Sequence, residues 1–314
     1  MNPAALSTHD LIFTSDSTAV GEDPRSLTRD VERGLLVKLR RGVYVPATAW
    51  KVLDTRARHL TMMKVAAYGA LHPLTFAGYS AAAVWGIPIW GDFPRDVTVL
   101  DRWKGGGRSE SGVRRTAAGF GSAVVEERDG FAVTSLARTA NQLCLTLPLR
   151  HAVATYDWSR WGKNEQAISM ESLVIDLEHL APRRGRRQAE RALGRSATLS
   201  ESFGESVARV VMWELGFPDP VLQREFTDSQ GSMFPDYAWL EYGVLAEFDG
   251  KQKYMREEYT RGDPGEALWR EKLREDRLRA LGFTIVRIVW ADIEHPERLA
   301  QKLLAAGVPR LRLR

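Results

Sequence analysis

Hydrophobic and polar positions in the last third of the chain follow a regular succession of helical and strand periods. Apolar residues recur with helical spacing over 202–215 and 266–281, and a glycine follows each stretch. Strands are predicted over 221–226, 235–240, 244–249 and 284–290, and a further helix over 297–306. The order α-β-β-β-α-β-α predicts a mixed α/β core within residues 199–314.

The first fifty residues carry the signals of a helix followed by a hairpin. Asp23-Pro24 suits the start of a helix, Gly34 suits its end, and two short strands flank a tight turn at 40–42. A helix followed by a basic hairpin is typical of a winged helix-turn-helix, whose helix enters the major groove and whose turn meets phosphates. The residues expected to contact double-stranded DNA are Arg25, Arg29, Lys38, Arg40 and Arg41. Short helix–hairpin units also occur in proteins that never bind DNA, so the pattern alone leaves both interpretations open.

The middle of the chain mixes helical and strand patterns. Helices are predicted over 55–71, 80–85, 135–145 and 149–158, and strands over 96–100 and 122–126. An arginine-rich helical stretch follows and is interpreted as a connector. The sequence thus predicts an α/β protein, α+β overall, in four segments: a winged helix-turn-helix (1–50), a mixed α+β domain (51–160), the connector (161–198) and a restriction-endonuclease-like α/β core (199–314).

Length and composition limit the classes of protein to which the chain can belong. With 314 residues, 44% of them hydrophobic and 27% charged, the chain suits two or three globular domains. It has no apolar run of membrane-spanning length, and its start, MNPAALSTHD, lacks the basic and then apolar regions of a secretory signal. We therefore expect a cytoplasmic protein with no membrane partner.

Charge and cysteine content bear on possible ligands. The net charge is only +4, but basic residues gather at 38–41, at 183–187 and near residue 314, which is compatible with a polyanionic partner. One cysteine, Cys144, rules out an internal disulfide and a thiolate zinc cluster, and the six histidines are scattered. A bound metal would therefore be held by carboxylates, which favours Mg²⁺ or Mn²⁺.

Acidic residues on two neighbouring predicted strands form the main candidate for chemistry. Asp236 and Glu247 lie on strands about 5 Å apart, and alternate residues of a strand share one face. Glu247, Asp249, Lys251 and Lys253 occupy every second position, while Glu205 lies in the first turn of the upstream helix. Convergent carboxylates can hold a divalent cation for phosphodiester hydrolysis. The predicted catalytic residues are Glu205, Asp236, Glu247, Asp249, Lys251 and Lys253, with the four acids as metal ligands.

A structural ion-pair network is the alternative interpretation of the same acids. Buried carboxylates need cations, and Arg270, Arg274 or Arg287 can supply them without any metal. An Asp and a Glu-x-Asp on neighbouring strands, with a helical Glu upstream, favour the metal site.

Several motifs resemble known families. Those that resemble very-short-patch-repair-like endonuclease domains of the PD-(D/E)XK superfamily are Phe234-Pro-Asp236, Glu247-Phe-Asp249-Gly250, Lys253-Tyr254, Trp269-x-Glu271-Lys272-x-Arg274-Glu-Asp276, Glu205-Ser206-x-x-Arg209 and Pro220-x-x-Gln223. Those similar to AbiEi-type antitoxin domains are Gly34-Leu-Leu-x-Lys38-Leu-Arg40-Arg41-Gly42-Val-Tyr44-Val-Pro46 and Ser80-Ala-Ala-x-x-Trp85-Gly86-Ile-Pro88. The combination resembles actinobacterial fusions of the two, and residues 102–195 match loosely.

The resemblance implies two functions. AbiEi-type antitoxins bind promoter DNA, repress their own operon and act beside a cognate toxin, whereas the nuclease superfamily implies Mg²⁺-dependent DNA cleavage. This sequence departs from the usual (D/E)-x-Lys pattern, because Asp249 stands where the lysine would be, which leaves Lys251 or Lys253 for that role. An active endonuclease and a DNA-binding regulator with a retained nuclease fold are therefore both predicted as candidates.

Overall fold

The computed structural model describes residues 5–15, 24–102, 112–180, 184–250 and 264–311. The protein is mixed α/β and divides into two compact units, each assembled from separate stretches of the chain. One unit, here the N-terminal unit, comprises residues 2–146 and 168–186; the other, the C-terminal unit, comprises 147–167 and 187–314. The division into four functional segments stays a prediction. None of the helices within these described ranges is long and apolar enough to cross a membrane.

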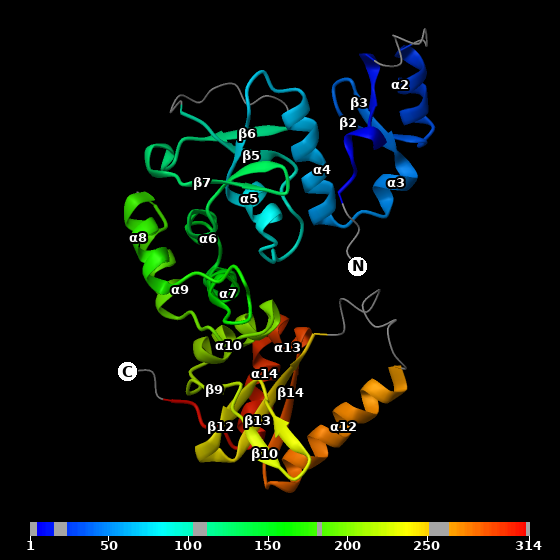
Figure 1. The fold of residues 1–314 in the computed structure, drawn as a ribbon. Coiled ribbons are helices and arrows are strands. Elements are labelled where there is room, and N and C mark those ends of the chain that lie inside the picture. The colour runs from blue at the N-terminus through cyan, green and yellow to red at the C-terminus, as the bar shows by residue number, and fades with distance from the viewer. Residues whose placement is uncertain (1–4, 16–23, 103–111, 181–183, 251–263, 312–314) are drawn as a thin grey trace. The chain divides into compact units, whose positions relative to one another are not determined.

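The N-terminal unit contains two sheets with helices around them (Figure 1). Its elements are η1 (Thr8–Asp10), β1 (Ile12–Phe13), α2 (Pro24–Glu32), β2 (Leu36–Arg40), β3 (Val43–Pro46), α3 (Ala47–Lys51), α4 (Thr55–Tyr68), β4 (Thr75–Phe76), α5 (Gly78–Trp85), β5 (Val97–Leu100), β6 (Val113–Thr116), η2 (Phe120–Ser122), β7 (Val125–Arg128), β8 (Phe131–Thr134), α6 (Leu136–Cys144) and α8 (Met170–Leu180).

A small antiparallel sheet, in the order β1-β3-β2, follows the predicted helix and hairpin. Gly34 ends the α2 region with a φ of 73°, a left-handed conformation that suits glycine. Lys38 pairs with Tyr44, and apolar residues of all three strands pack with Val65 of α4 into one core. The strand β1 was not predicted, because two residues are too few to show a period.

The larger sheet of this unit has the order β6-β5-β4-β8-β7. Buried groups tie its helices together: the Arg138 guanidinium of α6 donates to Asp176 of α8 at 2.9 Å and to the Gly119 carbonyl at 2.8 Å. Cys144 of α6 is fully buried. The strands β4, β6 and β8 were not predicted, and β4, with two residues, is too short to show a period.

The C-terminal unit carries the predicted acidic residues. Its elements are α7 (Leu149–Arg160), α9 (Arg186–Gly194), α10 (Phe203–Glu214), β9 (Val221–Leu222), β10 (Phe226–Asp228), β11 (Gly231–Met233), β12 (Tyr237–Trp239), η3 (Leu240–Tyr242), β13 (Val244–Asp249), α12 (Pro264–Ala280), β14 (Thr284–Val289), α13 (Trp290–Glu294) and α14 (Pro296–Ala306).

A four-stranded sheet, in the order β14-β13-β12-β9, lies between helices on both faces (Figure 1). The central strand β13 runs antiparallel to β12 and parallel to β14. Val244 and Ala246 face a core shared with α10, α13 and α14, whereas Leu245 packs against Leu278 of α12. This alternation agrees with the two-residue period, and it directs Glu247 to the same face as Leu245, toward α12.

One predicted strand, 221–226, is broken in the structure. β9 ends at Leu222 because Gln223 adopts a φ of 48°, and β10 then turns away to form a hairpin with β11. The Gln223 backbone N–H donates to the Asp236 carbonyl at 3.3 Å. A positive φ is uncommon outside glycine, so no strand pattern predicts it.

The helix α10 approaches the sheet closely through Gly204. A Cβ at this position would overlap the aromatic ring of Phe248 on β13. We expect Gly204→Ala to lower the free energy of unfolding of the C-terminal unit by about 1–3 kcal/mol, the usual cost of overpacking. Gly194→Ala in α9, where a Cβ meets nothing within 4 Å, is the matched control and should be neutral or stabilising. Urea denaturation compares them, and equal stability of the two variants would refute the close approach.

Candidate functional site

Two acids, the buried Glu205 and the half-buried Asp236, come together beside the start of β12. Glu205 lies in the first turn of α10, where the Ser202 side chain caps the helix. Its carboxylate accepts the Glu201 backbone N–H at 2.8 Å, and its carbonyl accepts the Tyr237 hydroxyl at 2.7 Å. Burial, and then the negative charge of Asp236, raise the pKa of Glu205 to about 7. A carboxyl in this position is protonated more readily than one in water.

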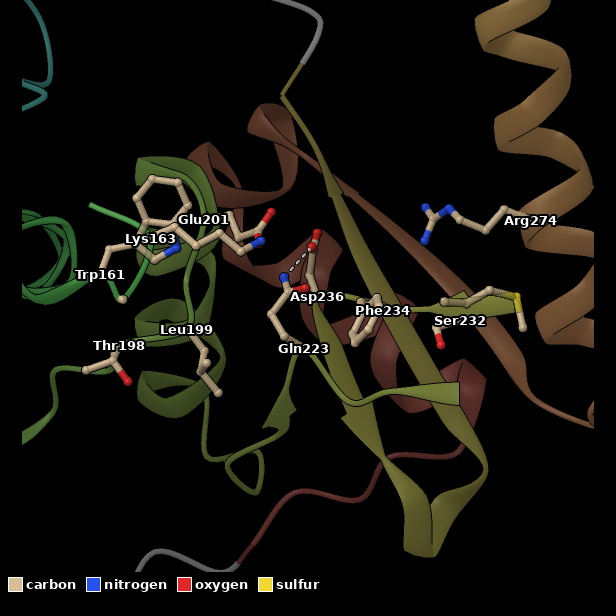
Figure 2. A pocket seen from close by; sticks show the side chains of 12 residues that line it. Trp161, Lys163, Thr198, Leu199, Glu201, Gln223, Ser232, Phe234, Asp236 and Arg274 are labelled. Carbon is tan, nitrogen blue, oxygen red and sulfur yellow. Dashed lines mark hydrogen bonds and ion pairs between the residues drawn. The ribbon is translucent and has the colours of Figure 1, made fainter. Parts of the chain in front are cut away.

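Asp236, directly before β12, is held by contacts to both of its carboxylate oxygens. The Phe248 backbone N–H donates to one oxygen at 2.8 Å, and the Gln223 side-chain amide donates to the other at 3.1 Å (Figure 2). Burial raises the pKa of Asp236, although these bonds and the nearby Arg274 charge act in the opposite direction. These two hydrogen bonds hold the Asp236 carboxylate in one orientation.

Glu247 occupies β13 as predicted and is 6% exposed. Arg274 of α12 lies 2.7 Å from its carboxylate, so an arginine supplies the cation that the ion-pair interpretation requires. Arg287, which pairs with Glu247 in the β13–β14 register, instead bonds to Glu275. Glu247 therefore reaches Arg274, while Glu205 and Asp236 form the carboxylate pair.

Asp249, Lys251 and Lys253 are the remaining predicted site residues. Asp249 ends β13, is half-buried and pairs with Val289 of β14. Lys251 and Lys253 lie outside the described residues. Within the described parts of the chain, no three side chains of the types His, Cys, Asp and Glu gather in a way that would hold a metal ion.

A pocket of about 640 Å³ opens beside Asp236 (Figure 2). Its lining comes from the loop after α7, the loop before α10, the β10–β11 hairpin region and α12. The lining residues are Trp161, Gly162, Lys163, Thr198, Leu199, Glu201, Gln223, Ser232, Met233, Phe234, Asp236 and Arg274. Trp161 and Lys163 were missed, because they precede the predicted core in the sequence.

A buried ion pair supports one wall of this pocket. Arg209 of α10 donates to Asp157 of α7 at 2.7 Å and to the Arg195 carbonyl at 2.7 Å. The same Asp157 carboxylate accepts the Ala197 backbone N–H at 2.7 Å. These bonds hold the segment that leads directly into the lining residue Thr198.

Three of the five predicted DNA-binding residues of the N-terminal unit line one pocket, and the other two lie outside its lining. Arg25, Lys38 and Arg41 line one basic pocket of about 590 Å³, together with Thr14, Thr28, Gly42 and Tyr44. Arg29 lies exposed on α2 outside this lining. Arg40 turns toward α4, where it donates to the Val65 carbonyl at 3.3 Å.

Comparison with protein-family models finds no match. The chain is similar to uncharacterized proteins of Mycobacterium tuberculosis, MT2308 of strain CDC 1551 / Oshkosh and Rv2248 of strain ATCC 25618 / H37Rv. Each is 33% identical over 180 residues, which are 55% of this chain and 61% of the relative. The chain thus spans about three fifths of the length of these relatives. Among solved structures, the RV2827C protein of M. tuberculosis shows 15% identity and a TM-score of 0.35 over 69% of this chain and 83% of that chain, a likeness too weak to support an argument.

Proposed function

We propose that the C-terminal unit is a Mg²⁺-dependent DNA endonuclease of the restriction-endonuclease-like type. The observation that carries the proposal is the pair of the buried Glu205 and the half-buried Asp236, of which Asp236 lines a pocket together with Lys163 and Arg274. Acids and cations around one pocket suit a phosphodiester, whose negative charge needs cations and whose hydrolysis needs a positioned water. The helices on both faces of the sheet and the acids of neighbouring strands support this fold assignment.

The acid pair fits Mg²⁺. This ion commonly binds through one or two carboxylates and fills its other positions with waters and substrate phosphates. The negative charge of Asp236 raises the affinity of Glu205 for a proton, and a divalent cation that takes the place of the proton relieves this repulsion. When bound, Mg²⁺ would polarise a water and stabilise the charge that develops on the phosphate.

Other residues of the chain orient the two acids and supply a positive charge. Gln223 and the Phe248 N–H orient Asp236, and the Ser202 cap fixes the turn that presents Glu205. Arg274 provides a fixed positive charge near Asp236, in place of the lysine that Asp249 displaces. A guanidinium at this position can hold a phosphate oxygen by charge-assisted hydrogen bonds.

Incubation of supercoiled plasmid with the full-length protein tests the proposal. Nicking or linearisation in Mg²⁺ or Mn²⁺, and none in EDTA, is the expected result. Intact plasmid at protein excess in both metals would remove the nuclease function.

The acid pair predicts a pH-dependent response to Mg²⁺. The pKa of Glu205 rises from 4.5 to about 7 on folding, so this carboxyl binds more protons in the folded metal-free protein than in the unfolded chain. The contribution of Glu205 to the free energy of unfolding therefore falls as pH rises from about 4.5 to about 7. Mg²⁺ needs the ionised acids, so it should raise the melting temperature more at about pH 8 than at about pH 5.5.

Glu205→Gln should weaken both effects, because glutamine neither titrates nor supplies a negative charge. Differential scanning fluorimetry in Mg²⁺ and in EDTA at the two pH values measures them. A Mg²⁺ shift that is equal at both pH values, or unchanged in the variant, would contradict the proposed ligand.

DNA binding by the N-terminal unit is a second candidate function, that of an AbiEi-type regulator or antitoxin with a winged helix. The observation that favours it is the basic pocket lined by Arg25, Lys38 and Arg41. Such a regulator would recognise double-stranded promoter DNA, and a cognate toxin would be its protein partner. The two functions are compatible within one chain.

Arg41→Ala tests this second function. Loss of one phosphate contact should weaken double-stranded DNA binding and lower the slope of log K against log salt by about 1. Lys51→Ala, an exposed charge outside the pocket, is the matched control. Fluorescence anisotropy at several salt concentrations measures the slopes, and identical slopes for wild type and Arg41→Ala would exclude this pocket.

A further inference from the structure

The pocket beside Asp236 has similar chemistry on two sides. In Figure 2, Trp161 and Lys163 lie on one side of Asp236, whereas Phe234 and Arg274 lie on the other. Each side thus combines one aromatic ring with one cation, and the carboxylate lies between them. Phe234 is 48% exposed, so its ring is accessible to a ligand.

Aromatic rings beside cations suit a nucleotide better than a simple anion. A base stacks on an aromatic face irrespective of its identity, while its phosphate meets a lysine or arginine. Bases within a duplex are covered on both faces by neighbouring base pairs. Stacking on protein side chains therefore requires a base that is unpaired or extruded from the helix.

We propose that this pocket binds unpaired DNA, with one base on Trp161, the next on Phe234 and their phosphates on Lys163 and Arg274, so that the phosphodiester bond between the two nucleotides lies beside Asp236 when Mg²⁺ offsets the negative charges. The proposal rests on the nuclease function and names its substrate class: DNA whose bases are unpaired at the cleaved bond. A pocket of about 640 Å³ lies within the range of about 300–1,000 Å³ that holds small organic ligands. The flanking cations bind the phosphates on each side.

Lys163 is able to take this role although it pairs with Glu201. Its side chain is 71% exposed and that of Glu201 is 40% exposed. An exposed ion pair of this kind contributes little stability, so a phosphate can displace Glu201 from Lys163. Arg274 is 29% exposed, and its contact with Glu247 fixes the guanidinium within the lining.

Fluorescence anisotropy with full-length protein in EDTA tests the proposal without cleavage. Three labelled DNAs of equal length serve as probes: a single strand, a matched duplex and a duplex with one bulged nucleotide. Trp161→Leu and Phe234→Leu should each weaken binding of unpaired DNA about 5- to 150-fold, the range for loss of one stacked base. Binding of the matched duplex, which the N-terminal unit would share, should not change.

Two further variants separate stacking from folding. Trp161→Phe keeps an aromatic face and should restore most of the affinity that Trp161→Leu loses. Trp269→Leu removes an exposed tryptophan of α12 that does not line the pocket, and it should leave every affinity unchanged.

The probes also distinguish the source of the unpaired base. Losses confined to the single strand would identify strand ends or flaps, and equal losses on the bulged duplex would identify extruded bases; both support the proposal. Affinities for unpaired DNA in Trp161→Leu and Phe234→Leu that match those of Trp269→Leu would overturn it. Because no metal is present, aromatic-dependent binding without cleavage of the same unpaired DNAs in Mg²⁺ would instead remove only the nuclease function.

Discussion

Asp236→Asn is expected to lower the rate of Mg²⁺-dependent DNA cleavage by about 10²- to 10³-fold, the usual loss when one preorganised charge-stabilising group is removed. Asparagine keeps the shape of the side chain and can still accept the Phe248 N–H. It lacks the negative charge that a divalent cation requires. The loss should therefore appear in the cleavage rate at saturating DNA, measured by the conversion of supercoiled plasmid.

A matched control separates the loss of Asp236 from the loss of any other acidic side chain in the same unit. Asp219→Asn removes an acid of the same unit that is 60% exposed and pairs with Arg195. Its cleavage rate should equal that of the wild type. Cleavage by Asp236→Asn at the wild-type rate would exclude the proposed site.

Asp157→Asn is expected to lower the free energy of unfolding of the C-terminal unit by about 3–5 kcal/mol. Asp157 is 1% exposed and accepts bonds from Arg209 and from the Ala197 N–H. Asparagine can keep one of these bonds, but its amide group would confront the Arg209 guanidinium, donor against donor. The buried arginine then lacks its counter-charge, which is the costly outcome.

Urea denaturation followed by tryptophan fluorescence measures this change. The Arg195–Asp219 pair again supplies the comparison, because the Asp219 side chain is 60% exposed and Asp219→Asn should cost less than about 1 kcal/mol. Similar stabilities for Asp157→Asn and Asp219→Asn would show that the buried pair does not support the pocket wall.

Local patterns predicted the elements of the C-terminal unit well. Strand β13 was predicted with its observed bounds, because a six-residue stretch between Gly243 and Gly250 leaves little freedom in its limits. The helix α10 was predicted to within a residue or two of its observed ends, since Ser202 marks its start and Gly216 follows its end. The end of β14 was predicted one residue late, because Trp290 suits a strand but opens α13.

Which residues form the site depends on tertiary contacts, and a local sequence pattern does not reveal them. Glu205 meets Asp236 because Gly204 lets α10 approach the ring of Phe248. Gln223 reaches Asp236 through a left-handed backbone conformation in what looked like a continuous strand. Trp161 joins the pocket from a loop distant in sequence, because α7 packs on α10.

Arg274 illustrates why both interpretations of the acids were reasonable. The sequence identified it as one of three possible partners for a buried acid, and the packing of α12 on the sheet selects it for Glu247. Of the four acids predicted as metal ligands, Glu247 thus has an arginine partner, and the proposal rests on Glu205 and Asp236.

Anomalous diffraction from crystals soaked in Mn²⁺ tests the central claim most directly. A peak within bonding distance of the carboxylate oxygens of both Glu205 and Asp236 is the predicted result, and it should vanish in Asp236→Asn crystals. No peak between these two acids at saturating Mn²⁺, with the pocket open to solvent, would contradict the metal site and the nuclease function proposed from it.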